Sequence, residues 1–366
     1  MIPVCTPNIG KEELKNITDA VETNWISSKG SYIELFEKKF AKYCGVKYGV
    51  ATNNGTAALH LAMVSLGIGK GDEVIIPNFT MISSALAIYY TGATPVFVDA
   101  KEDTWNINPN LIEEKITKKT KAILPVHIYG HPCDMDKINK IAKKYNLKVV
   151  EDAAEAHGAE YKGKKTGGLG DIGCFSFYAN KLITTGEGGM LVTNDEDIYN
   201  RARSLRDLSF GDKKRFLHKG VGFNYRMTNM QAAIGVAQME KIDKFLKIKR
   251  KNASYYNQLI KKIKNIKGPE EKKNVKNSYW MYGIRIGNNF GLSRDKVKER
   301  LFEDGIDTRD FFISMTEQPF FSHLQKGELF PISKKLSETG LYLPSGIDLN
   351  KKDMLYIYNI LRSYEK

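Results

Sequence analysis

Lys181 stands in a setting that could make its amine reactive. It follows the apolar and aromatic run Cys174–Tyr178 and precedes a turn rich in threonine and glycine. An amine among apolar neighbours has a lowered pKa, and its neutral form can attack a carbonyl to form a Schiff base. Ser176, five residues earlier, supplies a hydroxyl suited to binding a phosphate. The competing interpretation is a surface lysine whose alkyl chain covers apolar neighbours.

Two acids, Glu151 and Asp152, directly follow the apolar run Lys148–Val150. A carboxylate at the end of a buried strand costs desolvation free energy unless a cation faces it. The protonated nitrogen of a pyridine ring is such a cation, and holding that proton is what makes pyridoxal an electron sink. The alternative is that one of these acids caps the following helix.

A third segment, residues 52–58, joins a strand-like run to a helix through Asn54, Gly55 and Thr56. The N-terminus of a helix presents unpaired N–H groups, and a threonine hydroxyl beside them completes a ready anion site. Capping of the helix by Asn54 or Thr56 explains the same residues without any ligand. The residues alone leave both interpretations open.

Short apolar runs alternate with helical periodicity from residue 48 onward, which predicts an α/β fold. Runs without polar alternation indicate strands covered on both faces, and parallel strands need helical crossovers between them. The predicted strands are 48–51, 73–76, 95–98, 122–126, 148–150, 174–177 and 190–192, and the predicted helices include 11–23, 57–67, 80–91, 109–117 and 134–145. Ligands of such sheets bind beyond the carboxyl ends of the strands, so the chemistry is expected in the loops there.

The C-terminal part of the chain predicts a second unit. A long helical stretch runs from Thr228 to about Lys264, and a strand-like run at 279–286, a helix at 293–304 and a closing helix from about 350 follow it. We expect a large domain at residues 1–237, which includes the N-terminal segment, and a smaller α+β domain at residues 238–366.

The order of these features, a phosphate loop, then a strand-end aspartate, then a lysine, resembles the DegT/DnrJ/EryC1/StrS sugar aminotransferases of fold type I. The resemblance extends over nearly the whole chain. The stretches that carry it are residues 25–30, 54–62, 127–135, 151–156, 180–181, 184–190 and 222–229. It implies a pyridoxal 5′-phosphate (PLP) enzyme whose large domain holds a mostly parallel seven-stranded sheet, with a smaller C-terminal α+β domain.

The resemblance implies catalytic roles for two residues, Lys181 and Asp152. Lys181 would bind the cofactor covalently and later move protons, and Asp152 would pair with the pyridine nitrogen. Glu155 would face the cofactor ring or its hydroxyl. Met81 stands where the family often has an aromatic residue on the ring face, and thioether packing would serve there.

The family pattern also implies a phosphate site made by Gly55, Thr56 and Ser176. In family members the residue at the position of Asn224 reaches the phosphate in a neighbouring subunit. This implies a homodimer with active sites at the subunit interface. The alternative for Asn224 is a loop asparagine that bonds to local backbone.

Within the family the sequence is most similar to the branch that forms GDP-perosamine by aminating C4 of GDP-4-keto-6-deoxymannose, with L-glutamate as amino donor. Ser27, Lys29 and Arg309 are expected to contact the nucleotide sugar. A dTDP- or UDP-linked 3- or 4-keto sugar is the alternative substrate. A dehydratase branch replaces the cofactor lysine by histidine, so Lys181 argues against it. A non-catalytic binding or regulatory protein would be expected to lose Lys181 or Asp152.

Composition and charge restrict the class of protein and the kind of partner. The 366 residues are 42% hydrophobic and 27% charged, which is typical of a globular protein. Much of the net charge of +14 lies between Lys241 and Lys276, with the spacing of the solvated face of a helix, as in Lys241, Lys244, Lys247, Lys249, Arg250 and Lys251. We therefore expect no specific nucleic acid, while the positive field favours an anionic diphosphate substrate.

The four cysteines, Cys5, Cys44, Cys133 and Cys174, lie far apart and form no metal-ligand spacing. Buried free thiols and no metal are expected. No apolar run reaches the roughly 18 residues that would span a bilayer, and the first residues lack the features of a secretory signal. We expect a cytoplasmic protein without a membrane partner.

Overall fold

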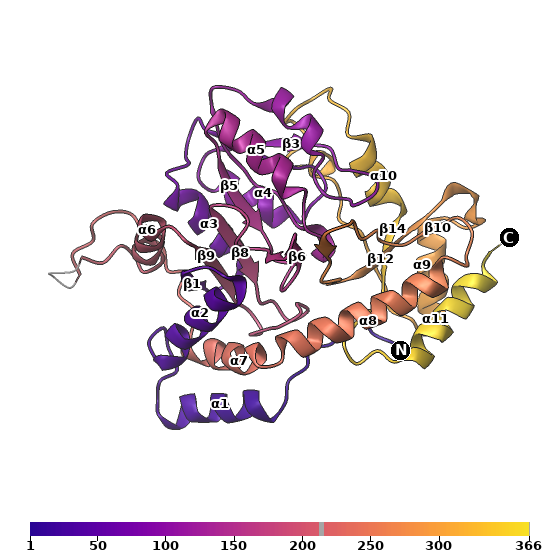
Figure 1. Cartoon of the computed structure of the whole chain (residues 1–366), viewed down its shortest axis with the longest axis horizontal. Helices are drawn as coiled ribbons and strands as arrows, with labels where there is room; N and C mark the ends of the chain where they lie inside the picture. Colours follow the sequence, from indigo (N-terminus) through magenta and orange to yellow (C-terminus); the bar gives the residue numbers. More distant parts are fainter. Residues whose placement is uncertain (212–215, 366) are drawn as a thin grey trace.

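Seven strands form the central sheet of the computed structural model, which describes residues 1–211 and 216–365 (Figure 1). They are β1 (Tyr48–Thr52), β2 (Glu73–Pro77), β3 (Thr94–Val98), β4 (Thr120–Ile123), β5 (Lys148–Asp152), β8 (Ile172–Ser176) and β9 (Gly189–Thr193). They lie in the order β1-β9-β8-β5-β4-β2-β3, and β9 alone among them runs antiparallel to its neighbours. The mostly parallel seven-stranded sheet predicted from the sequence is confirmed.

Both faces of this sheet are buried because alternate residues of a strand pack on different helices. On β2, Val74 and Ile76 belong to one hydrophobic core and Ile75 belongs to another. The helices on the first face are α3 (Gly55–Ser65), α4 (Ile82–Tyr89) and α6 (Glu196–Arg206), and those on the second are α2 (Ser31–Cys44), α5 (Met135–Tyr145) and α7 (Asn229–Met239). This two-sided burial explains why the strands appear in the sequence as continuous apolar runs.

A helical bridge connects the sheet to the C-terminal part. The sequence predicted one helical stretch from Thr228 to about Lys264, and the structure divides it into α7 and α8 (Ile242–Ile260), which follow each other across the lower part of Figure 1, above α1 (Lys11–Glu22). At the break, the Lys241 ammonium donates to both carboxylate oxygens of Glu13, at 2.8 and 2.7 Å. This contact ties the break to α1, which packs along α7. The predicted domain boundary after residue 237 falls inside α7, and the division into two domains remains a prediction.

A four-stranded antiparallel sheet forms the core of the C-terminal part. Its strands, in spatial order, are β10 (Ile266–Lys267), β12 (Tyr282–Ile286), β14 (Gly340–Leu343) and β13 (Arg309–Asp310). Its helices are α9 (Arg294–Glu303), α10 (Pro331–Thr339) and α11 (Lys351–Ser363). A third, small sheet consists of β6 (Glu160–Tyr161), β7 (Lys164–Lys165) and β11 (Val275–Lys276). The β6–β7 hairpin lies between β5 and β8 in the chain, and β11 of the C-terminal part pairs with β6.

The N-terminal segment also pairs with the C-terminal part. Ile2 forms a parallel bridge with Ile306, in which its N–H donates to the carbonyl of Gly305 at 2.7 Å and its carbonyl accepts from Asp307 at 2.9 Å. The carbonyl of Val4 accepts from Ser345 at 2.8 Å. Residues 2–4 therefore lie along elements that come late in the chain.

One predicted helix, 109–117, is wrong. The structure has two single 3-10 turns there, Pro109–Leu111 and Glu113–Lys115. The segment is short and must end before β4 begins at Thr120, and 3-10 turns are common as such connectors.

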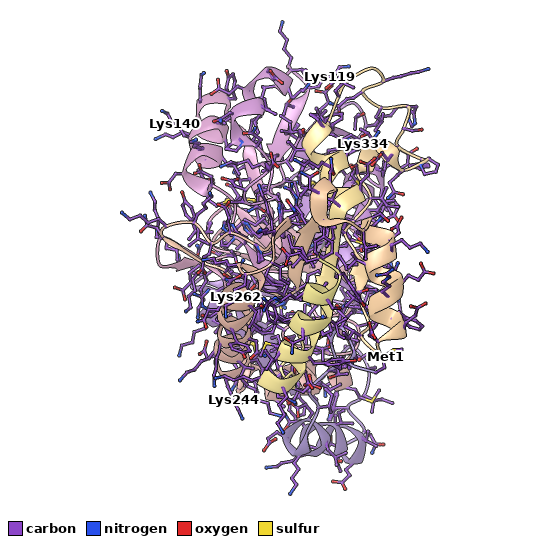
Figure 2. The ribbon with its side chains drawn as sticks, turned by 90° about the vertical axis from the view of Figure 1, so that its right-hand side faces the viewer. Met1, Lys119, Lys140, Lys244, Lys262 and Lys334 are labelled. Atoms are coloured by element: carbon purple, nitrogen blue, oxygen red, sulfur yellow. The ribbon has the colours of Figure 1, made fainter. Side chains whose placement is uncertain are left out.

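The basic stretch around α8 is only partly a solvated face, because Lys241 and Arg250 are half-buried and paired with Glu13 and Glu271. Lys244, Lys247 and Lys251 are exposed as predicted, and Lys244 lies at the edge of the molecule in Figure 2. The expectation for Lys249 is wrong, because its side chain is buried with 4% exposed. Position 249 follows Phe245 by four residues, so the helix carries it onto the buried face.

Within residues 1–211 and 216–365, no helix is long and apolar enough to cross a membrane, and no three His, Cys, Asp or Glu side chains gather as a metal site. Cys44, Cys133 and Cys174 are buried free thiols, as predicted, and Cys5 is partly exposed.

Candidate active site

A cleft of about 510 Å³ opens beyond the carboxyl ends of the parallel strands. This volume is in the range of small-molecule sites. Of the residues singled out in the sequence, the cleft is lined by Gly55, Thr56, Met81, Asp152, Glu155, Ser176, Lys181 and Arg309. The loops of the large sheet provide one wall, and the C-terminal part provides the other with Trp280, Phe312 and Tyr342.

Asp152 and Lys181 meet because their strands are neighbours. Asp152 ends β5, and Lys181 follows β8, which pairs with β5 in parallel register. Removal from water lowers the pKa of Lys181, an effect that the Glu155 and Asp152 carboxylates oppose. The Lys181 ammonium nitrogen lies 3.7 Å from the centroid of the Trp280 ring.

Asp152 is a buried acceptor with room for a further donor. It is 5% exposed, its Oδ2 accepts from the Ser84 hydroxyl at 2.7 Å, and its Oδ1 accepts from the Ala154 N–H at 3.1 Å. Burial raises the pKa of Asp152, and these hydrogen bonds and the Lys181 ammonium oppose the increase. A cationic N–H donor placed in the cleft would stabilise its charged form in the same way.

Glu151, the other acid of the pair, has no part in the cleft. Its carboxylate is fully buried and accepts from the N–H groups of Gly167, Leu169 and Gly170 at 2.7–2.8 Å. It also contacts His127 Nε2 at 2.9 Å. His127 Nδ1 accepts from a backbone N–H, so Nε2 carries the proton and donates to Glu151. Because successive residues of a strand face opposite sides, Glu151 supports the fold while Asp152 faces the cleft.

The loop at the start of α3 combines capping with a candidate anion site. Asn54 makes the cap, because its side chain accepts from the Ala57 N–H at 2.8 Å. Thr56 lines the cleft beside it. At Gly55 a Cβ atom would lie 2.7 Å from the Cβ of Ser176, so only glycine allows the helix to approach the end of β8 this closely. Asn54 lines the cleft as well, so the capping interpretation is confirmed and the anion site stays a prediction.

Glu155 and Met81 lie on other sides of the cleft. Glu155 is 5% exposed and accepts from the Tyr129 N–H at 2.7 Å, and burial raises the pKa of its carboxyl. Met81 precedes α4 and its side chain is 46% exposed toward the cleft.

Arg309, on β13, stands at the C-terminal wall of the cleft beside Asp310. Asp310 is itself engaged, since it forms ion pairs with Lys298 at 2.9 Å and Arg294 at 3.4 Å. The Arg309 guanidinium is also engaged, because it pairs with the Asp307 carboxylate and donates to the Thr308 carbonyl at 2.9 Å.

Three predicted site residues lie outside the cleft. Ser27, Lys29 and Asn224 are exposed on the surface of the same chain. They do not line the cleft that holds Lys181. Ser27 is fixed by its carbonyl, which accepts from the Asn229 N–H at 2.6 Å.

Several residues of the site were not predicted from the sequence. Ser84, Trp280, Phe312 and Tyr342 come from elements whose sequence patterns predict only packing. Ser84 could have been found from its place in the first turn of α4, the helix that follows β2, where its hydroxyl reaches Asp152 at the end of β5.

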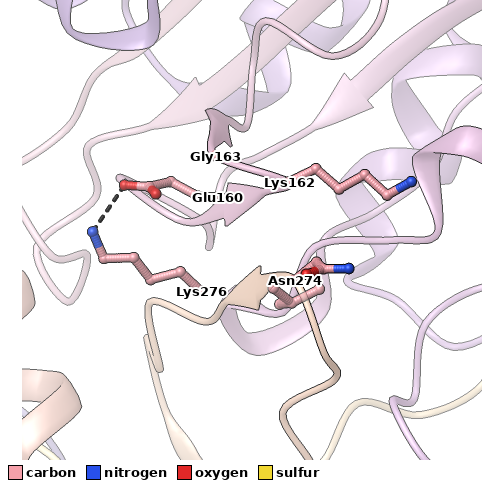
Figure 3. A pocket seen from close by; sticks show the side chains of 6 residues that line it. Glu160, Lys162, Gly163, Asn274 and Lys276 are labelled. Atoms are coloured by element: carbon pink, nitrogen blue, oxygen red, sulfur yellow. Dashed lines mark hydrogen bonds and ion pairs between the residues drawn. The ribbon is translucent and has the colours of Figure 1, made fainter.

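A second cleft, of about 480 Å³, lies between the β6–β7 hairpin and β11 (Figure 3). Its cations are already paired: Lys276 with Glu160 at 2.8 Å, and Lys162 with Asp136. None of its lining residues was singled out in the sequence.

Residues 7–362 match the DegT/DnrJ/EryC1/StrS aminotransferase family. The chain belongs to this family. It is 46% identical to the GDP-perosamine synthase of Caulobacter vibrioides, with 96% of this chain and 95% of that protein covered. It is 44% identical to the GDP-perosamine synthase of Escherichia coli O157:H7, with 99% and 98% covered. Among solved structures, the putative sugar aminotransferase Spr1654 from Streptococcus pneumoniae in its PMP-form superimposes with a TM-score of 0.93 at 26% identity, with 99% of this chain and 97% of that chain covered.

As an aminotransferase of this family the chain uses PLP, and the residues of the cleft fit that cofactor. A helix N-terminus with a hydroxyl lies at one end, a buried carboxylate lies at another, and an amine of lowered pKa lies between the cleft walls. These are the three groups that a phosphate, a protonated ring nitrogen and an aldehyde would need.

We expect substitution of the adjacent acids Glu151 and Asp152 to lower stability by different amounts. In Glu151→Gln the amide NH₂ would face donors of Gly167 and His127, so we expect a loss of about 3 kcal/mol in the free energy of unfolding. Asp152→Asn should change it by less than about 1 kcal/mol, because the amide oxygen can still accept from the Ala154 N–H and the Ser84 hydroxyl can accept from the amide NH₂. Urea unfolding of the cofactor-free proteins, followed by circular dichroism, measures both. Equal losses in the two variants would contradict the assignment of Glu151 to the fold.

Proposed function

We propose that this protein transfers the amino group of L-glutamate to C4 of GDP-4-keto-6-deoxymannose and so forms GDP-perosamine. The observation that carries the proposal is the shared cleft of Lys181 and Asp152, in a chain 46% and 44% identical over nearly its full length to two GDP-perosamine synthases. Arg309, which lines the cleft and pairs with Asp307, would exchange that partner for the anionic diphosphate of the nucleotide sugar.

Bound PLP supplies an electron sink for the bonds at the carbon that gains or loses the amine. Lys181 would hold the cofactor through its amine, and its lowered pKa favours the neutral form needed to make that bond. Once released, the same amine would move a proton at the substrate carbon. Asp152, kept in place by Ser84 and Ala154, would hold the proton of the pyridine nitrogen.

The remaining cleft residues would orient the cofactor. Gly55 and Thr56 at the N-terminus of α3, with Ser176 at the end of β8, would bind its phosphate. Glu155 would face the ring hydroxyl, and Met81 would pack on the ring face.

We also propose a homodimer in which one copy completes the cleft of the other. This would explain why Ser27, Lys29 and Asn224 lie on the surface and away from the cleft of their own chain. The loop that carries Ser27 also exposes Trp25 by 55% and Ile26 by 47%. Large apolar side chains at such exposure are typical of a surface that a partner covers. Ser27 and Lys29 would then contact the nucleotide sugar and Asn224 the phosphate in the partner's site.

Lys181→Arg should keep the fold and lose the reaction. A guanidinium stays protonated and cannot form the bond to the cofactor, so we expect turnover to fall about 1,000-fold or more. Lys162→Arg, at an exposed lysine outside the cleft, is the matched control and should retain wild-type turnover. Borohydride reduction of the wild-type holoenzyme followed by peptide mapping should place the cofactor on Lys181. An adduct on another residue would refute the role of Lys181.

The substrate is tested by incubating the enzyme with glutamate and GDP-, dTDP- or UDP-linked keto sugars. We expect amination of GDP-4-keto-6-deoxymannose at C4, identified by mass spectrometry and NMR, with a kcat/KM at least about tenfold above the others, since one well-placed polar contact is worth that much. Faster amination of a dTDP- or UDP-linked sugar, or of C3, would contradict the proposed substrate while leaving the aminotransferase role intact.

Mixed dimers test the shared site. In a dimer of Lys181→Ala and Asn224→Ala chains, one site carries both substitutions and the other carries neither. If the two variants are mixed in equal amounts and exchange at random, about half of the dimers are mixed, so we expect about a quarter of wild-type activity. Each variant alone should show less. If Asn224 served the site of its own chain, mixing would give only the average of the two parent activities.

A further inference from the structure

Trp280 is contacted by two lysines. The Lys181 ammonium nitrogen lies 3.7 Å from the centroid of its ring. The Lys249 ammonium donates to its backbone carbonyl at 2.7 Å. Trp280 itself is 5% exposed, lines the cleft and immediately precedes the segment that enters β12.

The plane of the indole is fixed by the segment that carries Lys181. The Trp280 Nε1–H donates to the carbonyl of Asn180 at 2.8 Å. Asn180 is the direct neighbour of Lys181 in the chain. The ring therefore keeps one orientation relative to the backbone from which the Lys181 side chain extends.

Lys249 fixes the backbone of Trp280 from the C-terminal part. It is 4% exposed, and its ammonium also donates to the carbonyl of Ser345, which follows β14. One buried cation thus joins the segments before β12 and after β14. Burial lowers the pKa of Lys249 to about 8, and Cys5 and Asp348 oppose this decrease. Burying the Lys249 ammonium costs desolvation free energy, and what it gains is two hydrogen bonds that fix the backbone at Trp280 and Ser345.

We propose that Trp280 is a positioning residue for Lys181: its indole face holds the Lys181 ammonium when that side chain is not bonded to the cofactor, and Lys249 holds Trp280 in place. The inference rests on the proposed role of Lys181. An amine that is released during the reaction and recaptured at its end needs a fixed position between these steps. The face of an aromatic ring attracts a cation and so provides such a position, without a direct hydrogen bond from the ammonium to a carboxylate that would have to break before the next step.

The titratable groups coupled electrostatically to Lys181 are Asp152, Glu155 and His157. The other charged or titratable groups that line its cleft stay unchanged in every variant of Trp280; they are Tyr178, Glu187, Arg309, Asp310 and Tyr342. The carboxylates of Asp152 and Glu155 favour the ammonium form and stay in every variant of Trp280. His157 is buried against Phe40, Phe175 and Phe177, and burial lowers the pKa of its ring to about 3, so it is neutral near pH 7. A change in the pKa of Lys181 on substitution of Trp280 would therefore report the loss of the indole face.

The test is the pH dependence of acetylation of Lys181 in the cofactor-free, full-length chain, followed by peptide mass spectrometry. Trp280→Met fills most of the volume without an aromatic face, and we expect the apparent pKa of Lys181 to fall by about one unit. Trp280→Leu gives a second non-aromatic variant in case the first does not fold. Trp280→Phe keeps an aromatic face, so the apparent pKa of Lys181 should stay close to its wild-type value.

Trp105→Leu is the matched control. Trp105 belongs to the same hydrophobic core as Trp280 but does not line the cleft, so this variant removes an indole at a distance from Lys181. It should leave the pKa of Lys181 unchanged even if it lowers stability. A folded Trp280→Met or Trp280→Leu protein with the wild-type acetylation profile would overturn the proposal. This result would be separate from a failure of the proposed function, because the labelling needs no cofactor or substrate and borohydride mapping tests the function independently.

Discussion

The structure depends on the burial of one amine beside two carboxylates. Lys181, Asp152 and Glu155 line a single cleft, where desolvation disfavours the charged form of each. Their mutual attraction offsets part of that cost, and fixed donors offset more: Ser84 and Ala154 at Asp152, and the Tyr129 N–H at Glu155. The parallel sheet makes this possible, because it brings the ends of neighbouring strands to one edge.

The large sheet and the groups at its carboxyl edge were predictable from the sequence. Apolar runs located its strands, and Gly55, Asp152, Ser176 and Lys181 share a cleft as the order of the strands and loops required. Local patterns sufficed there because each residue follows directly from its own strand.

Other features depend on contacts between distant segments. The strand Tyr48–Thr52 could be recognised from its own residues. In contrast, nothing near Trp280 in the sequence shows that its ring contacts Lys181, because packing of the C-terminal sheet brings Trp280 to the cleft. Lys249 has the spacing of the buried face of α8, but its own neighbours in the sequence do not show the carbonyls of Trp280 and Ser345 that accept from its ammonium there. The short strand Arg309–Asp310 exists only through its pairing with β14, so its own residues carry no signal.

The pairing of residues 2–4 with the C-terminal part constrains the order of events during synthesis. Ile2 and Val4 form backbone hydrogen bonds with residues 305, 307 and 345. A ribosome adds about 5–20 residues per second, so these early residues leave the exit tunnel many seconds before their partners exist. The large sheet can form during that interval, whereas the pairing of residues 2–4 forms only after residues 305, 307 and 345 have been synthesised. Ribosome-bound fragments that stop short of residue 305 would carry these residues without the partners they have in the finished protein.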